Sequence, residues 1–145
     1  MASKTGYKLS GLELRGVPPV PPLLLEGIAQ FNRGEYFEQH ETLEVLWRAE
    51  SGEIRRLYQG ILQVGVGLYH LRRGNYHGTV TLLGRGLANL TPFTPVSLGI
   101  DVQGLLEASV LVLREVERLG RHDLSAFDWG LAPRVRVGVS ETLLP

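Results

Sequence analysis

The sequence predicts an all-α protein, a compact bundle of about five helices built from helical hairpins. Apolar residues recur at helical spacing through most of residues 22–120, and glycine and proline mark the breaks between segments. A short motif also recurs, because Phe31–Tyr36 and Leu71–Tyr76 both place a glycine turn between a helix end and a helix start. With 145 residues the chain can bury one core, so we expect a single domain with extended arms at 1–21 and 121–145.

Proline and glycine bound the first two helices. Pro22 suits the first turn of a helix and Gly34 the position just past its end, because proline preorganises helix starts and glycine favours helix ends. Prolines before this point favour extended chain in the N-terminal arm. The second helix is expected over about 35–49, and Ser51 and Gly52 interrupt it.

Three further helices follow, each preceded by a polar residue that can cap it. A capping side-chain oxygen accepts a hydrogen bond from the first free backbone N–H groups of a helix. The predicted caps and helices are Ser51 before 53–73, Asn75 before 76–89, and Asp101 before 102–119. Pro92 and Pro95 predict a loop over 91–100. Gly60 and Gly67 share a face of the third helix, which predicts close packing against another helix.

The C-terminal arm has a different pattern. Val135, Val137 and Val139 alternate with arginine and glycine, which is the period of a β-strand. A lone strand cannot form a sheet. The segment is therefore expected to be an extended surface tail, to lie along the bundle, or to pair with the same segment of a second chain, giving a homodimer.

Composition excludes several classes of function. The chain has no cysteine, which excludes disulfides, thiolate metal sites and cysteine nucleophiles. Fifteen basic residues balance fifteen acidic ones, so the strong positive charge of a nucleic-acid-binding protein is missing. No apolar run is long enough to span a membrane, and the N-terminus does not resemble a secretory signal. We therefore expect a cytoplasmic protein without nucleic-acid or membrane partners.

Polar residues interrupt the apolar face of the second helix. At about 100° per residue, His40 and Glu44 fall inside an arc of large apolar side chains that includes Trp47, and Glu41 lies at its border. An unpaired buried carboxylate costs several kcal/mol. Glu44 therefore needs a partner: His40, an arginine, a hydrogen-bond network or a metal ion.

The third helix offers candidate partners for Glu44. It is apolar around most of its circumference, as a central helix would be. Gln59, Gln63 and His70 share one polar stripe, which either faces the second helix or simply faces water.

The motifs of these helices resemble a known family. Phe37–Trp47 contains a His-Glu-x-x-Glu-x-x-Trp run, Tyr58–Gln63 contains Gln-Gly-x-x-Gln, and Tyr69-His70 is followed by Gly74–Gly78. This pattern is similar to that of domain-of-unknown-function family 309 (DUF309), over roughly residues 24–119. The resemblance implies an all-helical fold and carries the label of a predicted metal-dependent hydrolase, without an established activity.

The first hypothesis for the polar cluster is a metal site. His40 and Glu44, one helical turn apart, can reach the same ion, and zinc, iron or manganese would suit an imidazole and a carboxylate. Glu41 would then stand where a general base activates water for hydrolysis. A third ligand must come from His70 or His77.

Two other hypotheses need no metal. In one, a buried structural network joins two helices through mutual hydrogen bonds. Its members would be His40, Glu44, Gln59 and Gln63, with Trp47 packed beside them. In the other, the chain is a non-enzymatic binding module for a peptide or small ligand, with a pocket lined by His40, Trp47 and His70. The sequence leaves open whether the protein is an enzyme.

Overall fold

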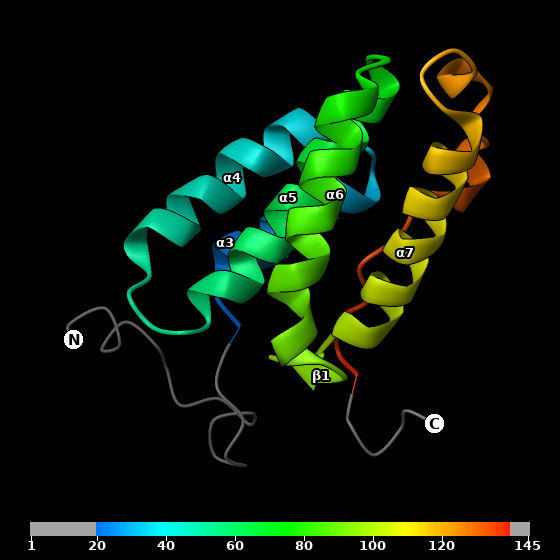
Figure 1. Ribbon diagram of the computed structural model, residues 1–145. Coiled ribbons are helices and arrows are strands. Elements are labelled where there is room, and N and C mark those ends of the chain that lie inside the picture. Colours follow the sequence, from blue (N-terminus) through cyan, green and yellow to red (C-terminus); the bar gives the residue numbers. More distant parts are fainter. Residues whose placement is uncertain (1–19, 140–145) are drawn as a thin grey trace.

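A computed structural model describes residues 20–139 and confirms the all-α bundle (Figure 1). Within these residues, five α-helices form the frame of the bundle. They are α3 (Pro22–Asn32), α4 (Tyr36–Ala49), α5 (Arg55–Arg72), α6 (Tyr76–Leu90) and α7 (Val102–Leu119). The predicted arm at 1–21 falls almost entirely outside the described residues, as do residues 140–145.

The repeated motif builds two equivalent helical hairpins, α3–α4 and α5–α6. Each turn depends on a glycine in the left-handed region, Gly34 at φ +79° and Gly74 at φ +76°. In each turn the residue after the glycine also donates its N–H to a carbonyl of the last helical turn. These bonds are Glu35 to Gln30 at 2.9 Å and Asn75 to His70 at 2.8 Å.

Helix α5 is central, with α4 and α7 on opposite sides of the α5–α6 pair (Figure 1). The predicted close approach at its glycines is confirmed. A Cβ at Gly60 would stand 2.9 Å from the Leu90 side chain, and a Cβ at Gly67 would stand 3.0 Å from that of Leu83. Side chains of α6 therefore pack directly against the backbone of α5 at these glycines, which fixes the position of α5.

Two of the three predicted caps are confirmed. The Asn75 side chain accepts from the N–H of Gly78, and that of Asp101 accepts from the N–H of Gly104, both at 2.9 Å. The Ser51 cap is wrong, because α5 begins at Arg55 after a turn and has no side-chain cap.

The segment predicted as a loop contains more order than expected. A 3-10 turn, η1 (Thr91–Phe93), leads into a small antiparallel hairpin of β1 (Val96–Ser97) and β2 (Ile100–Asp101). Strands of two residues are too short to produce a sequence period, so the pattern could not predict them.

The C-terminal segment docks on its own chain as far as residue 139, so the predicted extended arm is only partly right. Two 3-10 turns, η2 (Leu124–Ala126) and η3 (Trp129–Leu131), precede an extended stretch. Val135 is buried there, and Val137 forms a β-bridge with Ile100. Of the predicted alternatives, the segment lies along the bundle.

No helix among residues 20–139 has both the length and the apolarity to cross a membrane.

Candidate functional site

A cleft of about 190 Å³ opens between α4 and α5. We call it the polar cleft. Its walls combine apolar and polar side chains: His40, Glu44, Trp47, Gln59, Leu62, Gln63, Val66 and Leu82. The structure therefore brings five of the predicted site residues together. They come from α4 and α5, which pack against each other.

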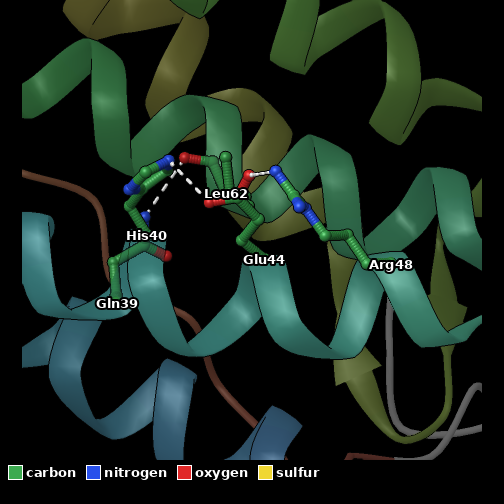
Figure 2. Close-up of polar contacts among 5 residues, drawn as sticks. All are labelled: Gln39, His40, Glu44, Arg48 and Leu62. Carbon is green, nitrogen blue, oxygen red and sulfur yellow. Dashed lines mark hydrogen bonds and ion pairs between the residues drawn. The ribbon is translucent and has the colours of Figure 1, made fainter.

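His40 and Glu44 form a pair at the rim of this cleft (Figure 2). His40 Nε2 lies 3.5 Å from Glu44 Oε1, and the other carboxylate oxygen accepts from Arg48 at 2.7 Å. The two side chains are 35% and 32% exposed. The expectation that both would be buried is wrong, because the Glu44 carboxylate reaches solvent and Arg48 balances its charge.

The fully buried polar side chain of α4 is Gln39, which the sequence analysis missed. Its Nε2 donates to the carbonyl oxygen of Leu62 at 3.1 Å (Figure 2). Its Oε1 is buried without a hydrogen-bond partner among residues 20–139. Gly65 supplies the space, since a Cβ there would stand 2.5 Å from Gln39 Cδ. Gln39 thus ties α4 to the backbone of α5 directly behind the cleft.

Trp47 is held from the α5 side. The guanidinium of Arg55 lies 4.2 Å from the centroid of the Trp47 ring, and its Nε donates to the Trp47 carbonyl at 3.1 Å. This cation–π contact orients the indole against the cleft.

The predicted glutamines play different parts. Gln63 accepts from Asn89 Nδ2 at 2.8 Å, so its amide oxygen is engaged by α6. Neither Gln63 Nε2 nor the Gln59 amide has a hydrogen-bond partner in the part of the chain that the structure describes. The predicted network of four residues is thus divided, with His40 paired to Glu44 and Gln63 paired to Asn89.

A second cleft of about 130 Å³ adjoins the first. We call it the aromatic cleft. Its lining is Tyr36, Phe37, His40, Val66, Tyr69 and His70. His40 and Val66 line both clefts, so His40 stands between them.

His70 belongs to the aromatic cleft and not to the polar one. Its Nδ1 lies 3.2 Å from Asn75 Nδ2. Burial, and secondarily the positive charge of Arg73, lower the pKa of His70 below its ordinary value of 6.5. The neutral imidazole is thus favoured. His77, the alternative third ligand, is exposed.

Glu41, the predicted general base, is exposed on the outer side of α4. It lines a shallow hollow of about 310 Å³ together with Glu44, Val45 and Arg48. Glu44 lines both this hollow and the polar cleft, whereas Glu41 lines only the hollow.

The positions of these side chains show whether they can supply the ligands of a metal ion. Within residues 20–139, no three His, Asp or Glu side chains gather as a group that could hold an ion. His40 and Glu44 offer two donors, whereas catalytic zinc sites use three protein ligands. The residues present do not make up such a set.

Comparison with known proteins places the chain among uncharacterised relatives. "Uncharacterized protein YpuF" of Bacillus subtilis (strain 168) is 30% identical over 106 residues, which are 70% of this chain and 61% of the relative. An "Uncharacterized protein" of Aquifex aeolicus (strain VF5) is 26% identical over 108 residues, which are 71% of this chain and 32% of the relative. The chain thus spans less than two thirds of either relative.

The family model described as "Domain of unknown function (DUF309)" matches residues 24–82. That match begins in α3 and ends in α6, and it includes every residue that lines the polar and aromatic clefts. The resemblance indicated by the His-Glu-x-x-Glu-x-x-Trp run is therefore confirmed, because the family model matches the segment that carries both clefts.

Proposed function

We propose that this protein binds a small, neutral, polar molecule in the polar cleft. The observation that carries the proposal is the gathering, on an apolar floor, of hydrogen-bonding groups that have no partner among residues 20–139. Gln59 and the Nε2 of Gln63 supply donors, and Trp47, Leu62 and Val66 supply apolar surface. Ligand sites typically combine an apolar lining with a few polar groups that fix orientation.

The charges of the cleft favour a neutral ligand. Arg48 donates to Glu44 at 2.7 Å, so the carboxylate is already balanced and a cationic ligand would have to compete with Arg48. Glu44 can still accept a hydrogen bond, since each carboxylate oxygen has two lone pairs. A flat molecule with amide groups would use the glutamine donors, the carboxylate acceptor and the indole surface together.

Tryptophan fluorescence tests this proposal directly. The chain has two tryptophans, so Trp129→Phe leaves Trp47 as the sole reporter. We expect neutral cyclic amides, with nicotinamide and uracil as the first probes, to change the Trp47 emission in a saturable way. Gln59→Leu should weaken binding by about tenfold, because it removes an amide donor and acceptor that have no partner within the described part of the chain.

The matched control lies on α4. Glu44→Gln changes a cleft residue, whereas Glu38→Gln changes an exposed carboxylate outside the cleft. Glu38→Gln should bind as wild type. Binding that neither Glu44→Gln nor Gln59→Leu changes would contradict the proposal, as would a probe panel that never alters Trp47 emission.

A metal-dependent hydrolase is the second candidate. It rests on His40 and Glu44, which place two donors at a solvent-accessible rim with Nε2 and Oε1 3.5 Å apart, and it requires a third ligand beyond this pair. Zinc, iron or manganese should then copurify with untagged protein and be lost in His40→Ala, measured by elemental mass spectrometry. Wild-type protein that takes up none of these metals on titration would contradict this candidate and leave the first proposal untouched.

A further inference from the structure

The aromatic cleft has the size and walls for a single aromatic ring. Its volume of about 130 Å³ is close to the roughly 150 Å³ of an engineered apolar cavity that binds benzene. The Phe37 and Tyr69 rings lie 5.8 Å apart between centroids, and the Phe37 and His40 rings lie 6.2 Å apart. These separations are in the range of interacting aromatic pairs, so an added ring would find edges and faces to contact.

Asn75 fixes the tautomer of His70 in this cleft. The Oδ1 of Asn75 accepts from the N–H of Gly78 at 2.9 Å, because Asn75 caps α6. Its Nδ2 must therefore face His70, where it lies 3.2 Å from Nδ1. Since Nδ2 can only donate, Nδ1 of His70 accepts and the ring proton resides on Nε2.

Gly78 and burial keep that imidazole in place. A Cβ at position 78 would stand 2.7 Å from His70 Cγ, so only glycine leaves room for the ring against the start of α6. Burial and the Arg73 charge lower the pKa of His70, which agrees with a neutral ring. His70 thus offers its Nε2–H as a hydrogen-bond donor, since that group has no partner in the range 20–139 that the structure describes.

Two arginines lie beside the cleft, and the Glu44 carboxylate next to His40 is already paired with Arg48. Arg72 lies 5.0 Å from the centroid of Tyr36, and Arg73 lies 5.6 Å from that of Tyr69. Both rings line the cleft, and no carboxylate is among its lining residues within 20–139. This surrounding charge favours an anion over a cation.

We propose that the aromatic cleft binds a small aromatic carboxylate, with the ring packed against Phe37 and Tyr69 and the carboxylate accepting from His70 Nε2–H. Asn75 is the positioning residue, because it acts only through the tautomer of His70. The inference is independent of the ligand proposed for the polar cleft, since the two clefts share only His40 and Val66.

Benzoate is the probe, and nitrogen-15 NMR of the histidine rings is the measurement. At about pH 8, where an ordinary histidine is neutral, we expect His70 in the Nε2–H tautomer and a saturable shift of its signals with benzoate. Cyclohexanecarboxylate should bind more weakly than benzoate because it lacks the π-face that the walls contact.

Two variants separate recognition from folding. Asn75→Asp keeps the capping oxygen for Gly78 but replaces the Nδ2 donor with an acceptor, so the proton should move to Nδ1 and benzoate binding should fall at least fivefold, roughly the effect of one hydrogen bond. Phe37→Ala removes a wall residue that is 48% exposed, so binding should be lost with little loss of stability. Val45→Ala, on the same helix and 60% exposed, is the control and should bind as wild type.

The proposal is overturned by an Nδ1–H tautomer in the wild-type protein, by the absence of saturable benzoate shifts at millimolar concentration, or by unchanged binding in Phe37→Ala or Asn75→Asp. None of these outcomes involves Trp47 emission. Failure here is therefore distinct from failure of the polar-cleft proposal.

Discussion

Gly86 of α6 lies against the backbone of Gly60 in α5. A Cβ at position 86 would stand 3.0 Å from the carbonyl oxygen of Gly60 and 2.8 Å from Cγ2 of Val64. Backbone atoms cannot turn aside as a flexible side chain can, so this contact sets the distance between the two helices. The α5 wall of both clefts depends on that distance.

Gly86→Ala is accordingly expected to destabilise the protein by about 1–3 kcal/mol, the usual cost of overpacking. Gly84→Ala is the matched control on the same helix. It meets no atom within 4 Å, so the added methyl should stabilise the helix by about 0.5–1 kcal/mol. Urea denaturation of the two variants measures both values, and equal free energies of unfolding would contradict the packing argument.

Asn32 joins the end of α3 to the C-terminal segment. Its side-chain amide donates to the Val135 carbonyl at 2.9 Å and accepts from the Val135 N–H at 2.8 Å. Asn32→Ala removes both bonds and should cost about 1–3 kcal/mol. Asn32→Asp keeps the acceptor and should retain more of the hydrogen-exchange protection at the Val135 amide. If that amide is equally protected in all three proteins, the two Asn32–Val135 hydrogen bonds do not hold the C-terminal segment in place.

The lowered pKa of His70 predicts a pH-dependent stability. Because the folded protein binds this proton less readily than the unfolded chain, the contribution is fully present above the ordinary pKa of 6.5. It falls as the pH drops from there through the lower pKa of the folded state.

Melting temperatures across this range provide the measurement. His70→Gln should show a smaller loss of melting temperature on acidification than the wild type. His77→Gln, at an exposed position, is the control and should follow the wild-type curve. An identical acid dependence in His70→Gln and wild type would rule out this contribution.

Ser109 in α7 is fully buried, and its hydroxyl has no hydrogen-bond partner among residues 20–139. Ser109→Ala should therefore be neutral or stabilise by about 1 kcal/mol, since it removes an unpaired buried polar group. The Ser97 hydroxyl instead donates to the Phe93 carbonyl at 2.9 Å. Ser97→Ala should thus be the less stable variant in thermal unfolding, and the reverse order would contradict the assignment.

The sequence predicts the helix boundaries well because local chemistry sets them. Gly34, Gly74 and the caps Asn75 and Asp101 act on their immediate neighbours, so one chain is sufficient to recognise them. Ser51 fails as a cap because an intervening turn places the start of α5 at Arg55, and nothing local indicates that turn.

The candidate site was harder to predict, because helix periodicity does not give the depth of each side chain. Helix α4 buries Tyr36, Gln39 and Leu43, whereas Phe37 is half exposed and His40 and Glu44 lie at the edge of the buried face. Gln39 can be buried only because Gly65 on the neighbouring helix lacks a side chain. Such complementarity between two helices appears only once their packing is known.

The pair of hydrogen bonds between Asn32 and Val135 also bears on the order in which the molecule folds. It joins residues 103 positions apart, whereas both hairpins close through short glycine turns. Closing a long loop costs more entropy, and contacts between near neighbours in the chain form faster. We therefore expect the hairpins to form early in refolding and the C-terminal segment to dock last. All residues of the two clefts precede position 83, so both clefts can assemble before that final step.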